Sequence, residues 1–191
     1  IKGVTQGNLA AINSVLASIP VTDASVDTPA KLQAIVDAYN KVLAAADGTD
    51  GNAAAAPSAA DYSAIGVAGT TDASAKLLSD MVDGLAATAV DTVAELQALA
   101  DAAKAAVGYT GAAGQTAPTA DQLNAIAGGA GVTADNLAAV QAAVAAANAD
   151  GTPVTQAELA KIVADITAAA AGIGAFADAN STGLANATDT A

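Results

Sequence analysis

The chain contains no cysteine, histidine, arginine or tryptophan. Without cysteine it can form neither a disulfide nor a thiolate metal site. Without histidine, cysteine and arginine it also lacks the common nucleophile and base pairs, the usual zinc ligands and the guanidinium groups that clamp phosphates. A Schiff-base role for Lys76 or Lys104 would require an apolar pocket, for which a small alanine-lined bundle has little room. These absences predict that the chain is not an enzyme and carries no cofactor.

Aromatic side chains are also scarce, at 2% of the 191 residues. Much of the 53% hydrophobic content is alanine, which buries little area. Because stabilisation scales with the apolar area that is buried, it must rest on scattered Leu, Ile, Val and Met residues. A single small helical unit would therefore be marginally stable by itself.

Positive charge is sparse, since six lysines face 19 acidic groups and the net charge is −13. Phosphate backbones are bound by clustered cations, so nucleic acid is excluded as a partner. The simplest interpretation of the acidity is a solvated surface that keeps a secreted or salt-exposed protein soluble. Two sharper hypotheses are calcium binding and a halophile protein whose folding requires molar salt.

Long apolar runs are missing as well. The most apolar stretch, residues 137–147, is mostly alanine and much shorter than the roughly 20 residues of a membrane-spanning helix. The sequence therefore predicts no membrane span. It shows no signal peptide and begins at Ile1 without methionine, which suggests a fragment or a processed product.

An internal repeat is the main feature that is present. Residues 26–38 (VDTPAKLQAIVDA) match residues 90–102 (VDTVAELQALADA), and residues 154–163 continue the pattern. A second marker, Gly-Val, occurs at 3–4, 66–67 and 131–132, with Thr following at 5 and 133. A third marker, at Pro57 and Pro118, opens the second and third units and has no counterpart ahead of the first. Repeats of this length are typical of arrays whose units bury a joint core.

Each unit is predicted to contain three helices, because alanine favours helix and strand alternation is absent. The expected fold is all-α, with tandem three-helix bundles of about 64 residues in an elongated array. The predicted boundaries are an incomplete repeat at 1–50, complete repeats at 53–111 and 117–171, and a linker or docking tail at 172–191, where the apolar pattern weakens.

Helix starts are marked by capping residues. Ser58 and Thr119 are expected to begin the short first helices, and the second helices are expected to begin near Thr5, Thr71 and Thr133. The third helices begin at Thr28-Pro29 and at two capping boxes, Thr92 with Glu95 and Thr155 with Glu158. The expected apolar stripes of the first unit comprise Leu9, Ile12, Leu16 and Ile19 on one helix, and Leu32, Ile35, Val36, Tyr39, Val42 and Leu43 on the next.

The ordered recurrence of Gly-Val-Thr and Val-Asp-Thr resembles the three-helix repeats of giant secreted bacterial surface and biofilm-associated proteins. It is more distantly similar to the albumin-binding three-helix module of bacterial surface proteins. The resemblance covers about residues 1–171. It implies an extracellular or cell-surface location and a spacer, adhesive or lattice-forming role. Albumin binding is not carried over, because no contact positions of that module can be matched in this sequence.

Acidic Asp-Gly turns supply the oxygen ligands that calcium prefers. The candidates are Asp47, Asp50 and Asn52 in one loop and Asn148 and Asp150 in another. The second loop misses the helix-loop-helix calcium pattern, because aligning Gly151 with the sixth position leaves Glu158 one residue late. Calcium is therefore the weaker hypothesis at both loops.

The leading hypothesis is a structural or adhesive repeat whose partners are neighbouring copies or adjacent repeats of the same protein, assembled into a fibre or layer. The alternative is a module that binds a host or matrix protein through helix faces, with Tyr39, Tyr62 or Tyr109 as anchors. Because Tyr39 and Tyr62 lie on apolar stripes, core packing is expected for both. A first helix missing from residues 1–50 would be supplied by a longer array or by another subunit.

Overall fold

The computed structural model describes residues 1–18, 26–49, 51 and 56–187, with side chains only up to residue 173. Within these ranges the chain is helical, which confirms the all-α class. The α-helices are α1 (Leu9–Ser18), α3 (Pro29–Ala45), α4 (Ala59–Ala64), α5 (Asp72–Asp83), α6 (Val93–Val107), α7 (Ala120–Ala127), α8 (Leu137–Ala147) and α9 (Gln156–Ala187). Short 3-10 turns lie at Ala87–Ala89 and Asn148–Asp150.

The predicted capping residues begin several of these helices. The Thr92 hydroxyl accepts a hydrogen bond from the Glu95 backbone N–H at 3.2 Å, and the Glu95 carboxylate accepts one from the Thr92 N–H at 3.0 Å. Thr155 and Glu158 form the same reciprocal pair at the start of α9. These bonds satisfy N–H groups that have no partner inside the helix. Further N-caps of the predicted kind are Thr28, Ser58, Thr71 and Thr119.

Two second helices begin later than predicted, each directly after an asparagine whose side chain bonds the backbone ahead of the helix. Asn8 donates to the Gly3 carbonyl at 2.7 Å and accepts from the Thr5 N–H at 2.7 Å. Asn136 bonds Gly131 and Thr133 in the same way, at 2.9 and 2.8 Å. The side chain closes a loop on the preceding backbone, so α1 and α8 begin only at the next residue.

The glycine marker in the second unit also needs correction, since Gly69 and not Gly66 is the counterpart of Gly3 and Gly131. All three glycines lie two residues before the threonine that precedes a second helix. Each also rests against the third helix of its own unit. An added Cβ would lie 2.9 Å from Asn40 Nδ2 at Gly3, 3.0 Å from Lys104 Nζ at Gly69 and 2.5 Å from Val163 Cγ1 at Gly131.

The apolar stripe of α1 is rotated relative to the prediction. This helix buries Ala11, Ile12 and Val15, whereas Leu9 is 46% exposed and Leu16 is half-buried. Ile19 lies outside the described residues. The face that turns inward is the one that meets α3 and α6, and helical periodicity alone could not identify those neighbours.

Helices of successive repeat units pack directly on one another. Helix α3 contacts α4 and α5 of the second unit, α6 contacts α1 and α7, and α9 contacts α5. The buried apolar side chains, which come from all three units, form one cluster. The predicted division into separate three-helix bundles is therefore not confirmed.

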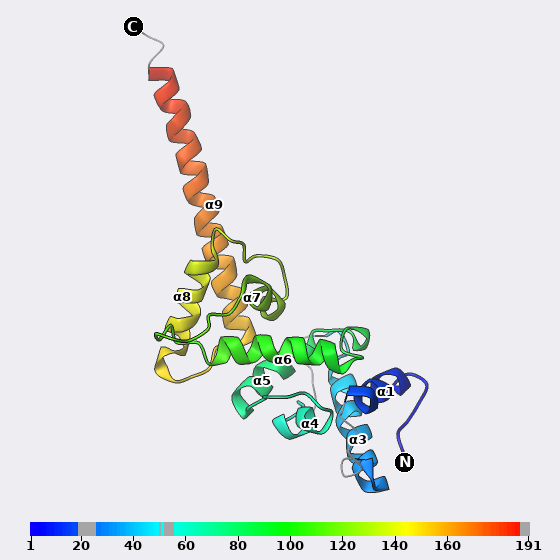
Figure 1. Cartoon of the computed structure of the whole chain (residues 1–191). Helices are drawn as coiled ribbons and strands as arrows, with labels where there is room; N and C mark the ends of the chain where they lie inside the picture. Colours follow the sequence, from blue (N-terminus) through cyan, green and yellow to red (C-terminus); the bar gives the residue numbers. More distant parts are fainter. Residues whose placement is uncertain (19–25, 50, 52–55, 188–191) are drawn as a thin grey trace.

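The last helix is longer than the repeat pattern indicates. The pattern weakens at Gly172, yet α9 passes through this glycine and ends at Ala187. Its C-terminal part projects from the packed helices (Figure 1). The alanine-rich sequence favours helix even where there is no core to pack against.

Candidate functional site

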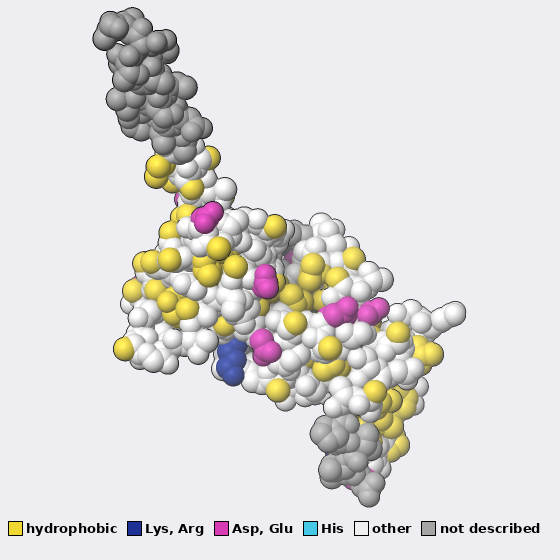
Figure 2. All heavy atoms as spheres, turned by 45° about the horizontal axis from the view of Figure 1, so that its top comes forward, with side chains coloured by type: hydrophobic (Ala, Val, Ile, Leu, Met, Phe, Trp, Pro, Cys, Tyr) yellow, Lys and Arg dark blue, Asp and Glu magenta, His cyan; other side chains and the backbone are white. Residues whose placement is uncertain are grey.

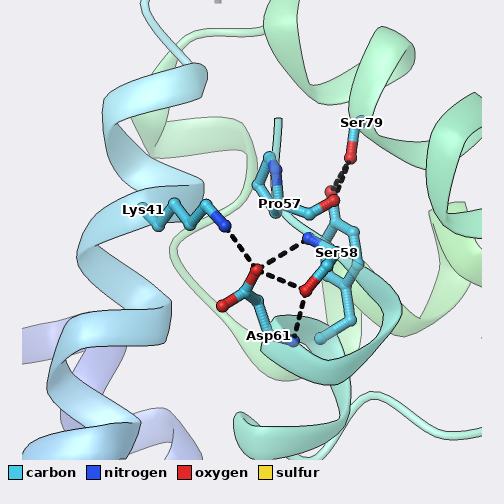
Figure 3. A network of polar contacts seen from close by, with 6 residues as sticks. Lys41, Pro57, Ser58, Asp61 and Ser79 are labelled. Atoms are coloured by element: carbon cyan, nitrogen blue, oxygen red, sulfur yellow. Dashed lines mark hydrogen bonds and ion pairs between the residues drawn. The ribbon is translucent and has the colours of Figure 1, made fainter. Parts of the chain in front are cut away.

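Several polar side chains bond across the contacts between repeat units. In Figure 3, Lys41 reaches from α3 to Asp61 in the first turn of α4. The Lys41 ammonium lies 2.7 Å from Asp61 Oδ2. The same oxygen accepts hydrogen bonds from the backbone N–H and the hydroxyl of Ser58, at 2.7 and 2.6 Å. One carboxylate thus caps α4 and ties it to the preceding unit.

This environment changes the acidity of Asp61. Partial burial acts to raise its pKa, but the hydrogen bonds from Lys41 and Ser58 outweigh burial and hold the pKa below its ordinary value. These bonds favour the charged carboxylate over the neutral acid. Asp61 is therefore held as a carboxylate by its hydrogen bonds to Lys41 and Ser58.

A buried pair of hydroxyls continues the network behind Asp61. Ser79 on α5 donates to the Pro57 carbonyl at 2.8 Å, and the Tyr62 hydroxyl lies 3.1 Å from Ser79 Oγ. Because the Ser79 proton is used toward Pro57, Tyr62 is the donor of the second bond. Burial raises the pKa of Tyr62 to about 12; the Ser79 bond offsets part of this rise, while the negative charges of Asp61 and Asp80 add to it.

Tyr39 on α3 bonds across a junction between units. Its hydroxyl donates to the Val90 carbonyl at 2.9 Å, just ahead of α6. Burial, followed by the negative charges of Asp91 and Glu95, raises the pKa of Tyr39 above its ordinary value. Both Tyr39 and Tyr62 are fully buried, as their places on the apolar stripes predicted, so neither is an exposed anchor for a partner.

Asn148 makes the corresponding junction between the second and third units. Its amide nitrogen donates to the carbonyls of Ala106 and Tyr109, each at 2.8 Å. Its amide oxygen accepts from the Val154 N–H at 2.8 Å. The side chain is buried. Its oxygen, which the sequence offered as a calcium ligand, bonds the loop before α9, and its nitrogen bonds the end of α6.

The other calcium candidates that the structure describes, Asp47 and Asp150, each bond within their own turn. Asp47 accepts from the Thr49 N–H and Asp150 from the Thr152 N–H, both at 2.8 Å, which are local turn bonds. Asp50 and Asn52 lie outside the described residues. Within the described ranges, no group of three or more acidic, histidine or cysteine side chains could hold a metal ion. Calcium binding stays a prediction.

The sequence analysis did not identify two glutamines that each bond both backbone groups of a residue far away in the chain. Gln33 on α3 accepts from the Lys2 N–H at 2.7 Å and donates to the Lys2 carbonyl at 3.0 Å. Gln97 on α6 binds both backbone groups of Ala68 in the same way, at 2.8 and 3.2 Å. The available signal was that glutamine recurs at the same place in the repeat. Each of these glutamines holds the segment before the second helix against the third helix of the same unit.

Surface hollows are shallow and mixed in character. One, of about 430 Å³, is bordered by Asp101, Lys104, Tyr109 and Gln115. Another of about 430 Å³ lies between α7 and α9 and is lined mainly by alanine, glycine and Val163. On the face that Figure 2 shows, acidic side chains are scattered among small and apolar ones and do not converge on a single hollow.

No helix in the described part of the chain is both long enough and apolar enough to cross a membrane. Comparison with known proteins returned no matching family model, no matching curated protein and no matching solved structure.

Proposed function

We propose that this chain is a structural, adhesive repeat segment of an extracellular bacterial surface protein, and that it assembles with adjoining repeats or neighbouring copies into a fibre or layer. On this proposal it is not an enzyme and binds no nucleic acid. The observation that carries it is the placement of the buried polar side chains. Tyr39 and Asn148 each join one repeat unit to the next.

Such bonds make the units depend on one another. A buried carbonyl that loses its partner costs free energy, so each junction bond favours one relative position of the two units. Alanine faces add to this effect by allowing helices to approach closely. A stack of units with fixed geometry is suited to setting distances, which is the task of a spacer or a lattice element.

The extracellular location rests on the resemblance of the repeat to those of secreted surface proteins and on the acidic composition, which favours solubility. Electron microscopy and light scattering over a range of concentrations test the assembly. Elongated or polymeric particles are expected, whereas a compact, monodisperse monomer at all concentrations would contradict assembly. Secretion is tested separately, by fractionating cells that produce the natural protein.

The second candidate is a module that binds a host or matrix protein. One observation favours it: Tyr109 is half-buried beside the hollow of about 430 Å³ described above. A partly exposed tyrosine is a common interface anchor. Pull-down from serum or matrix with the purified chain, compared with its Tyr109→Ala variant, separates the two functions, because only a binding module would lose a captured protein on this change.

A further inference from the structure

The first and third repeat units have the same framework but different surfaces. In both, an asparagine side chain bonds the backbone just before the second helix. These residues, Asn8 and Asn136, are buried to a similar extent, with 7% and 9% exposure. In both, a glycine rests on the third helix of the unit. Residues of the two units can therefore be compared one by one, at an offset of 128 set by Gly3 and Gly131.

The apolar residues around this framework are more exposed in the first unit than in the third. Val4 is 44% exposed, whereas its counterpart Val132 is 4% exposed. Leu9 is 46% exposed and Leu137 is half-buried. On the third helix the offset falls to 127, because the third unit is one residue shorter before this helix. Leu32 is half-buried there, while its counterpart Leu159 is fully buried.

In the third unit α7 binds Val132, the counterpart of Val4. Asn124 on α7 donates to the Val132 carbonyl at 2.9 Å and accepts from the Val132 N–H at 2.8 Å. Leu123 and Ile126 of the same helix are fully buried, and α7 packs on both α6 and α9. The third unit therefore provides an example of a short helix that packs on this part of a repeat.

We propose that the apolar face formed by Ile1, Val4, Leu9 and Leu32 is a docking site for one short capped helix of the α7 type, supplied by an adjoining repeat. This inference deepens the proposed function by naming the element that binds one face of the segment. If docking fails, the spacer role of the units that are already packed together still stands.

The chemistry of the partner follows from α7. It is a helix of about two turns that begins with Ser or Thr and carries Leu and Ile three residues apart, as at Leu123 and Ile126. An asparagine in the place of Asn124 reaches the backbone of Val4. A second copy of this chain is a poor donor, because its own α7 is already packed on α6 and α9 and would have to be released.

The test is to place a copy of residues 117–128 directly before Ile1, so that Ile1 takes the position of Gly129 in the third unit. The melting temperature of the extended chain should rise by about 3 to 6 °C. Hydrogen exchange at the Val4 and Leu9 amides should slow by at least about tenfold, as expected when an exposed segment gains cover. The matched control carries Leu123→Asp and Ile126→Asp in the added copy only.

Equal melting temperatures for the two extended chains would overturn the proposal. A Leu9→Asp change provides a further check, since it should alter the melting temperature of the original chain little but remove the gain in the extended one. Light scattering distinguishes a different occupant. If the original chain dimerises and Leu9→Asp abolishes the dimer, a second copy occupies this face and the repeat helix does not. These melting and scattering measurements are independent of the electron microscopy that tests assembly. Docking and the proposed function can therefore fail separately.

Discussion

The hydroxyl of Tyr39 donates a hydrogen bond to the carbonyl oxygen of Val90, 2.9 Å away and 51 residues later in the chain. The bond crosses from the third helix of one repeat unit to the residues just before the third helix of the next. Both residues are fully buried. The effect of removing this bond on stability therefore tests whether the two units fold together.

Replacing Tyr39 with Phe removes the donor and leaves the buried Val90 carbonyl without it. We expect the free energy of unfolding to fall by about 1 to 3 kcal/mol. Urea denaturation monitored by circular dichroism measures this loss. Tyr109→Phe is the matched control, because Tyr109 is half-buried, and it should change stability by less than about 0.5 kcal/mol. An equal effect of the two substitutions would show that the Tyr39 bond does not hold the units together.

Asn148→Ala removes the two amide bonds across the junction and the bond to Val154. We expect a loss of about 2 to 4 kcal/mol, since the Ala106 and Val154 groups that it bonds lie in buried positions. Asn13→Ala, on the exposed side of α1, is the matched control and should be nearly neutral. If a role in calcium binding were the reason for Asn148, its replacement would instead reduce a calcium-dependent rise in melting temperature and leave the metal-free protein unchanged.

Gly131→Ala tests the close approach to α9. The added Cβ would lie 2.5 Å from Val163 Cγ1, so the helix or the loop must move. We expect a destabilisation of about 1 to 3 kcal/mol. Gly129→Ala is the matched control, because a Cβ there meets open space and neither glycine has a positive φ. Similar melting temperatures for the two variants would rule out tight packing at Gly131.

The Lys41 to Asp61 pair predicts part of the acid sensitivity. The folded-state pKa of Asp61 is lowered, so its contribution to stability is complete above its unfolded pKa of about 3.9 and is lost as the pH falls through the folded value. Asp61→Asn should lower stability at pH 7 by about 1 kcal/mol and reduce the slope of melting temperature against pH below about pH 4. Thermal melts between pH 2 and 7 measure both effects. An unchanged slope would contradict the assignment, and Asp121→Asn provides the comparison at an exposed carboxylate.

Calcium is tested by calorimetric titration of the metal-free chain. Because Asn148 already uses its amide oxygen internally, and Asp47 and Asp150 bond their own loops, we expect neither binding heat nor a shift in melting temperature. A saturable binding heat together with a rise in melting temperature would instead support a calcium site at residues 47–52. Magnesium at the same concentration is the control for general screening of the −13 net charge.

The starts of most helices could be predicted from the sequence because a cap is a local event. Ser58, Thr92 and Thr155 each bond a backbone N–H three residues ahead, so the whole interaction lies within one helical turn. The same reasoning failed at Thr5 and Thr133. There the asparagine three residues later competes for the same backbone, and both arrangements are compatible with the local sequence.

The sequence by itself determined that this protein is helical, where most of its helices begin, and that it lacks the residues of the common catalytic sites. Only the tertiary structure decided which faces are buried and which residues join the units. Leu9 and Leu137 occupy equivalent positions in similar helices, yet they differ in exposure. Val4 and Val132 differ likewise, and Val132 is the residue that Asn124 of α7 bonds. Burial depends on neighbours of this kind, which helical periodicity within a unit does not specify.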